Sequence, residues 1–238
     1  MSSGKSLWAT EIVPEFGKMI NNGSLSITAV AVNNMQQQEG VIQFDLRWRQ
    51  TGTIKADLAA LSAWRDILWK LELIGEDPRR YQGYGFGNVS QRHGAGDRFI
   101  ISGTQTGQLK TIEACHYALV TGFDPHRNQV TAEGPVQPSS ESMTHGVIYS
   151  LDQSVNCVLH VHSPAIWNAA AKLGVPLTRA DIDYGTPEMA AEVGRLFRES
   201  DVREQGLFAM AGHLDGIVSF APTVEAAAVT LIKTLARC

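Results

Sequence analysis

The spacing of apolar side chains along the chain alternates between a period of two and a period of three to four. The short period is typical of a strand with one buried face, and the longer period is typical of an amphipathic helix. Strands are predicted at residues 25–32, 41–48, 98–102, 116–123, 129–134, 157–162 and on both sides of the Asp-Gly turn in 206–221. Helices are predicted after Asp57, over residues 138–151, from Thr186 and from Thr223 to about Arg237.

Turn-forming residues separate these elements. We expect loops at QQQEG (36–40), at the glycine-dense GYGFGNVSQR (83–92) and at SGTQTG (102–107). Several neighbouring strands are joined as hairpins, which predicts a mixed or mostly antiparallel sheet covered by helices rather than a regular parallel series. The whole chain, 1–238, is expected to form a single domain in which residues 1–50 are a β-rich N-terminal extension.

Composition narrows the class of protein. The 238 residues are 44% apolar and 18% charged with a net charge of −4, which is ordinary for a globular protein. No run of Lys and Arg favours nucleic acid or an anionic membrane as a partner, and no window approaches the roughly 18 apolar residues of a membrane span. The N-terminus lacks a signal-peptide pattern, and Cys115, Cys157 and Cys238 show no disulfide or CxxC spacing. A reducing cytoplasm is the expected location.

Two histidines in HVHSP (160–164) are the first candidate for chemistry. Because side chains alternate along a strand, His160 and His162 point to the same side, about 7 Å apart, where they could hold one metal ion. The alternative is a hydrogen-bonded core histidine beside one at a loop edge, and for the bare motif this alternative is favoured. His213 follows another apolar strand just before a tight turn, and a side chain there could reach a neighbouring strand end.

Glu141 is predicted in the first turn of the helix over 138–151. It is either an acid that interacts with the helix dipole or a carboxylate near a metal, as a ligand or as a general acid/base. Ser139 and Ser140 beside it make that helix start a candidate anion site. The polar turns GFGNVS (85–90) and SGT (102–104) offer further backbone N–H and hydroxyl groups.

Five motifs in this order resemble the signature of the class II aldolase/adducin family. They are GNVSQR (87–92), FIISGTQTG (99–107), PSSE (138–141), HVHSP (160–164) and MAGHLDGIV (210–218). The resemblance runs from about residue 57 to the C-terminus. It implies a three-layer α/β/α sandwich with a mixed, mainly antiparallel central sheet. It also implies a homotetramer.

The same resemblance implies the residues of the site. It implies a divalent metal, with Zn²⁺ as the expected ion, bound by His160, His162 and His213. Glu141 would be the fourth ligand at rest and the catalytic acid/base once substrate displaces it. The residues implied around the substrate phosphate are Gly87, Asn88, Ser90, Ser102, Gly103, Ser139 and Ser140.

The activity implied is that of an aldolase, a lyase that cleaves or forms a C–C bond of a small sugar phosphate through a zinc-stabilised enediolate. An epimerase or a dehydratase acting on a pentulose or methylthio-sugar phosphate with the same site is an alternative. A non-catalytic assembly domain like the adducin head is an alternative of another class, although four convergent ligands serve no purpose in assembly. Tyr184 is near the position of the tyrosine proton donor of family aldolases, but the segment 163–212 is short, so the donor stays unassigned. His145, four residues after Glu141, is expected to be structural.

Overall fold

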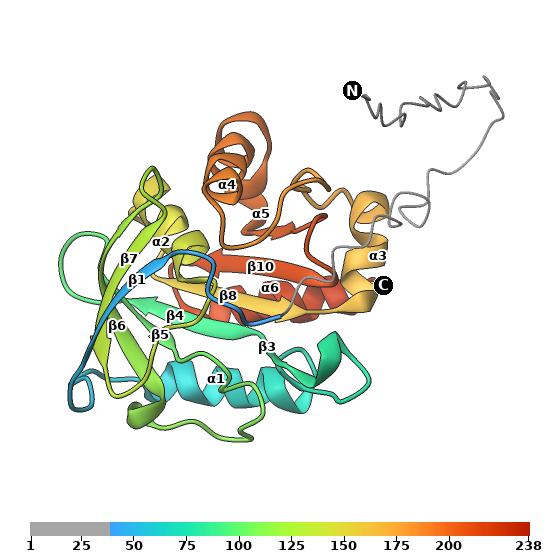
Figure 1. Ribbon diagram of the computed structural model, residues 1–238. Coiled ribbons are helices and arrows are strands. Elements are labelled where there is room, and N and C mark those ends of the chain that lie inside the picture. The colour runs from blue at the N-terminus through green and yellow to red at the C-terminus, as the bar shows by residue number, and fades with distance from the viewer. Residues whose placement is uncertain (1–38) are drawn as a thin grey trace, which may run out of the picture. The chain divides into compact units, whose positions relative to one another are not determined.

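A computed structural model of the chain describes residues 39–238 (Figure 1). Most of the extension predicted over 1–50, including the strand predicted at 25–32, lies outside the described residues. The described part of that extension ends in β1 (Asp45–Gln50), which forms one edge of the main sheet. The strand predicted at 41–48 is thus present, but it begins and ends a few residues later.

The main sheet has eight strands in the order β1-β7-β6-β5-β4-β8-β10-β9. Besides β1, they are β4 (Asn88–Arg92), β5 (Phe99–Ser102), β6 (Tyr117–Asp124), β7 (Gln129–Gly134), β8 (Cys157–His162), β9 (Leu207–Ala209) and β10 (Gly216–Ala221). All neighbours run antiparallel except β1 and β7. The prediction of a mixed, mainly antiparallel sheet is therefore confirmed. A separate small sheet pairs β2 (Gly75–Glu76) with β3 (Gly85–Phe86).

Helices cover both faces of the main sheet, which confirms the three-layer arrangement (Figure 1). On one face, α1 (Ala59–Lys70) and α3 (Pro164–Leu173) both pack against α6 (Val224–Leu235). On the other face, α2 (Ser142–Leu151) packs against α4 (Pro187–Glu199), which the short α5 (Val202–Gln205) follows. Single 3₁₀ turns occur at Tyr81–Gly83 and Ala114–His116.

The ends of several helices are set by capping side chains. The hydroxyls of Ser163, Thr186 and Thr223 each accept a hydrogen bond from the backbone N–H three residues later. Such a cap typically stabilises a helix by about 1 kcal/mol. The helix starts predicted at Thr186 and Thr223 are confirmed. Helix α3 was not predicted from the sequence, although Ser163 followed by Pro164 is a typical start signal.

Two elements differ from their predicted bounds. Helix α2 begins at Ser142 rather than near residue 138, because Ser139–Glu141 form a turn in which Ser139 Oγ accepts the N–H of Glu141. Glu141 is therefore the N-cap residue of α2 and does not lie in its first turn. The loop predicted over 83–92 contains β4, a strand in the middle of the sheet.

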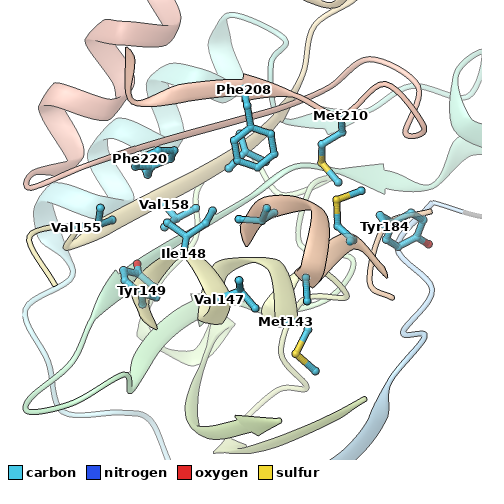
Figure 2. Packing of buried hydrophobic residues seen from close by; sticks show 14 of the residues in the cluster. Met143, Val147, Ile148, Tyr149, Val155, Val158, Tyr184, Phe208, Met210 and Phe220 are labelled. Carbon is cyan, nitrogen blue, oxygen red and sulfur yellow. The ribbon is translucent and has the colours of Figure 1, made fainter. Parts of the chain in front are cut away.

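The core on the α2 side fixes this helix against the strands that carry the histidines. Figure 2 shows Met143, Val147 and Ile148 of α2 in the same cluster as Val158 of β8 and Phe220 of β10. Burial of a large apolar side chain typically contributes about 1.5–3 kcal/mol. Packing of this kind positions α2, and with it Glu141, relative to β8. Within residues 39–238, no helix combines the length and the apolar character that crossing a bilayer requires.

Candidate metal centre

Strand β8 carries His160 and His162 in the interior of the sheet. It lies between β4 and β10, so that His160 is opposite Asn88 on one side and Val218 on the other. Both imidazoles are buried, with exposures of 0% and 1%. As the strand period predicts, they point to the same side: their Nε2 atoms lie 3.1 Å apart.

His213 approaches from the turn between β9 and β10. Its Nε2 lies 3.0 Å from Nε2 of His162, so the three imidazoles converge through the same ring nitrogen. The turn is tight: Asp215 has a φ of 63°, and the N–H of Gly216 donates to the His213 carbonyl at 3.0 Å. A Cβ on Gly216 would lie 2.7 Å from Cδ2 of His213, so the close approach of the ring requires glycine there.

Glu39 completes this cluster, and it was not predicted from the sequence. Its carboxylate oxygens lie 3.1 Å from Nε2 of His213 and 3.5 Å from Nε2 of His162. The QQQEG stretch was expected to be only a turn. Glu39 is adjacent to Gly40, which has a φ of 72°. An acid beside a turn glycine is common, so no local signal distinguished this one.

The four side chains fit a divalent metal. One ligand atom from each of Glu39, His160, His162 and His213 lies within 4.8 Å of the others. Tetrahedral Zn²⁺ bound at roughly 2.0–2.1 Å by imidazole places its nitrogen ligands about 3.3 Å apart. The Nε2 separations of 3.1 and 3.0 Å are close to that value. Three imidazoles with one carboxylate are also a ligand set that zinc favours.

Protonation states in the cluster favour metal binding. Burial lowers the pKa of both His160 and His162, so these rings are neutral and can offer a lone pair. Burial also opposes the charging of His213, but the Glu39 and Glu141 carboxylates raise its pKa. Burial alone would raise the pKa of Glu39, yet His213 and His162 outweigh it and hold the pKa below its usual range. The cluster therefore contains an ionised carboxylate beside the neutral imidazoles of His160 and His162.

Glu141 lies on the other side of His213. Its Oε1 is 4.0 Å from Nδ1 of that ring, whereas Glu39 and His162 approach the same ring at Nε2. The side chain is 1% exposed, and no hydrogen bond of ordinary geometry reaches its oxygens from the described residues. Burial raises the pKa of Glu141 to about 7. The structure thus brings Glu141 to the edge of the metal cluster, and its role as a ligand stays a prediction.

A narrow polar pocket lies beside the cluster. Five of the seven residues expected around a phosphate line it: Gly87, Asn88, Gly103, Ser139 and Ser140. Glu39 and Gly40 also line it. Gly87 has a φ of 79°, and a Cβ there would lie 2.7 Å from Cγ1 of Ile74, so the wall at this point depends on glycine.

The other two residues expected at the phosphate face elsewhere. Ser102 Oγ accepts a hydrogen bond from the N–H of Val89 at 3.1 Å, which joins β5 to β4. Ser90 Oγ lies 2.8 Å from Nδ1 of His145 and 2.7 Å from the hydroxyl of Tyr149. Their hydroxyls therefore stabilise the sheet and its contact with α2 instead of lining the pocket.

Tyr184 packs against the metal cluster with its ring. The ring centroid lies 4.6 Å from that of His213 in an edge-to-face arrangement. The hydroxyl donates to the carbonyl of Val41 and accepts the N–H of the same residue, each at 3.2 Å. The structure thus uses Tyr184 to hold the segment that follows Glu39.

Comparisons with known proteins agree with this fold. The solved L-fuculose 1-phosphate aldolase is 17% identical with a TM-score of 0.56, and the match covers 78% of this chain and 86% of that chain. The L-fuculose-1-phosphate aldolase of Thermus thermophilus is 20% identical with a TM-score of 0.52, and the match covers 74% and 87%. A sugar-phosphate aldolase of Thermotoga maritima is 12% identical with a TM-score of 0.55, and the match covers 74% and 88%. At these identities the likeness establishes the fold alone.

The family model gives the assignment. None of the curated proteins compared with the chain matches it. The model described as "Class II Aldolase and Adducin N-terminal domain" matches residues 77–238, which include α2, β8 and the turn that carries His213. On that match, together with the fold, the chain belongs to the class II aldolase/adducin family.

Proposed function

We propose that the protein is a metal-dependent lyase that cleaves or forms a C–C bond of a small sugar phosphate. The observation that carries this proposal is the convergence of three imidazole Nε2 atoms and a carboxylate within 4.8 Å, next to a pocket lined by Ser139 and Ser140. An assembly domain would have no use for such a cluster, because burying four titratable side chains together is costly without a cation.

The ligand set of Glu39, His160, His162 and His213 would hold the metal, which we propose to be Zn²⁺. A bound divalent cation supplies charge that stabilises the negative charge developing on the oxygens of a hydroxy-carbonyl substrate. The ligand side chains fix the position of that charge, because the sheet holds the elements that carry them. Strand β8 lies inside the sheet, and the β9–β10 turn joins its last two strands. Structural preorganisation of this kind is the main source of electrostatic catalysis.

Glu141 would transfer the proton in the reaction. A general acid/base works best when its pKa lies near the working pH, and burial raises the pKa of Glu141 to about 7. Its carboxylate is at the edge of the cluster, 4.0 Å from the His213 ring, without a competing hydrogen bond of ordinary geometry in the described structure. We assign no tyrosine as a second proton donor.

The substrate phosphate would bind in the pocket beside the cluster. Backbone N–H groups next to glycines, with the hydroxyls of Ser139 and Ser140, suit a phosphate, and the start of α2 adds a favourable dipole. We further propose a homotetramer in the cytoplasm. The proposal of a reducing compartment is supported by the free thiols of Cys115, Cys157 and Cys238. Light scattering measures the mass of the assembly and so tests the tetramer.

The test is a panel of ketose phosphates and their unphosphorylated analogues, incubated with the zinc-loaded chain. We expect cleavage of at least one phosphorylated member into an aldehyde and a smaller carbonyl compound, with the unphosphorylated analogue at least a hundredfold slower. Formation of an epimer, or loss of water without cleavage, would assign the same site to an epimerase or a dehydratase. If a fully metal-loaded chain turns over no member of the panel, the proposal that the protein is an enzyme is wrong.

A further inference from the structure

Residues 39–41, which we call the strap, meet two parts of the site at once. The Glu39 carboxylate faces Nε2 of His213 at 3.1 Å and Nε2 of His162 at 3.5 Å. The next residue, Gly40, lines the anion pocket together with Ser139 and Ser140. One short segment therefore contacts both the metal ligands and the place proposed for the phosphate.

The strap is held in place from two sides. Oγ1 of Thr104, in the SGTQTG turn, donates to the carbonyl of Gly40 at 3.3 Å. The Tyr184 hydroxyl donates to the Val41 carbonyl and accepts the Val41 N–H. Each such hydrogen bond contributes about 1 kcal/mol, which is enough to favour one position of a segment but little enough to be reversed by a ligand.

With the strap in place the pocket beside the cluster is narrow. Its volume is about 10 Å³, room for about one water molecule. The walls on the far side belong to the central strand β4 and to the start of α2, which the core holds in position. Among the described residues, the strap is held by polar contacts to Thr104 and Tyr184.

We propose that the strap is an internal competitor of the substrate: Glu39 binds the metal in the resting chain, and the strap leaves the metal and the anion pocket together when a phosphorylated hydroxy-carbonyl compound binds. This inference rests on the proposed function. It means that Glu39 is not a permanent ligand and that the three histidines alone hold the metal while substrate is bound. A strap that is bound nine-tenths of the time lowers the apparent affinity of any competing ligand about tenfold.

The experiment measures two probes by calorimetric titration of the zinc-loaded full chain. Acetohydroxamate offers two oxygens to the metal, and inorganic phosphate tests the anion pocket. Glu39→Ala is expected to tighten the Kd of both probes about tenfold while metal content stays at about one per chain. Glu225→Ala, which removes the same charge from an exposed position of α6, is the matched control and should change neither Kd.

The variant Tyr184→Phe loosens the strap without removing the negative charge of Glu39, so it tests the two effects separately. It removes both hydrogen bonds to Val41 but keeps Glu39, every histidine and the ring that packs on His213. We expect it to tighten both Kd values about threefold. Tyr117→Phe, which removes a buried hydroxyl that pairs with Ser62, is its control. Cobalt-loaded chains add a spectroscopic reading, because loss of the Glu39 ligand should shift the visible absorption bands.

The outcomes distinguish a strap that leaves both the metal and the pocket from a Glu39 that is only a displaceable ligand or a permanent one. Tighter acetohydroxamate binding without tighter phosphate binding would make Glu39 a displaceable ligand and overturn the strap. Unchanged affinities, or metal lost from Glu39→Ala, would make Glu39 a permanent ligand and overturn it as well. If both probes bind more tightly in both variants but no sugar phosphate is turned over, the strap stands and the proposed reaction fails. A wild-type chain that cannot be loaded with metal overturns both.

Discussion

Two clusters of buried polar side chains lie on the same sheet and both involve α2, but their polar atoms meet different partners. In the metal centre the Nε2 atoms of His160, His162 and His213 face one another. In the second cluster the Ser90 hydroxyl lies between Nδ1 of His145 and the hydroxyl of Tyr149, at 2.8 and 2.7 Å. We call the second group the Ser90 cluster.

The difference shows how a ligand site is distinguished from a structural one. A hydroxyl can donate one hydrogen bond and accept another, so the contacts of the Ser90 cluster can be closed by its own protons. Neutral imidazoles have one N–H each, and burial holds the pKa of His145 down at about 3, so its ring stays neutral. Three ring nitrogens and a carboxylate that converge on one point are instead satisfied by a shared cation. Burial alone does not separate the two clusters, but the direction of the donor atoms does.

The largest effect is expected from exchanging one histidine in each cluster. His160→Ala should lower metal affinity at least a hundredfold and turnover at least a thousandfold, because the centre loses one of three nitrogens. His145→Asn should retain about one metal per chain, since Nδ1 of His145 pairs with Ser90 and His145 is not one of the four ligands. Elemental analysis after dialysis, with turnover of the best substrate, measures both variants. Metal lost equally from both variants would show that the two clusters are one functional unit.

The sequence predicted the part of the metal centre that depends on local geometry. HxH on a strand places two imidazoles on one face whatever the rest of the chain does, and the structure confirms that they do so. His213 and Glu141 have no such local rule: their positions made them candidates, and the resemblance to a family selected them as ligands. Glu39 was missed because it reaches the histidines from an unremarkable turn far away in the sequence, and no pattern in the chain indicates that contact.

The Ser90 assignment shows a second limit. Asn88 and Ser90 lie on the same face of β4, but about 7 Å apart along the strand. Asn88 therefore lines the narrow polar pocket beside the cluster while Ser90 meets α2. Residues 83–92 were predicted to form a loop, and a loop does not determine which side chains share a face or how far apart they lie. The different positions of Asn88 and Ser90 were therefore not predicted. The mainly antiparallel sheet was predictable, since its hairpins have local turn signals.

The next effect concerns Glu141, the residue at the start of α2 that faces the metal centre. Glu141→Gln should lower turnover by about 10²–10⁴, the range of a general acid/base, while the metal stays bound. Glutamine keeps the size of the side chain but cannot accept a proton. Single-turnover rates and metal content measure the two effects separately. Turnover within threefold of wild type would remove Glu141 from the mechanism.

The same variant should change how stability depends on pH. The folded chain keeps the Glu141 proton up to a pKa of about 7, whereas the unfolded chain releases it near the ordinary value of 4.5. Between these values the folded state binds more protons, so Glu141 lowers the stability of the wild type as pH rises, by about 3 kcal/mol at most. Urea unfolding of chelator-treated chains from pH 4 to pH 8 should therefore show a smaller loss in Glu141→Gln. Parallel curves for the two chains would mean that Glu141 titrates at its ordinary pKa.

The smallest effect is expected from the hydroxyl at the end of the Ser90 cluster. Tyr149→Phe removes one hydrogen bond and keeps the ring, over which the Arg92 guanidinium lies at 4.9 Å. The cost should be about 1 kcal/mol of unfolding free energy, because Ser90 still pairs with His145. Metal content and turnover should stay within twofold of wild type. A fall in turnover of tenfold or more with the metal retained would instead connect the Ser90 cluster to proton transfer at Glu141. The connection would run through His145, one helical turn along α2 from Glu141. The separation between a structural and a catalytic cluster would then no longer hold.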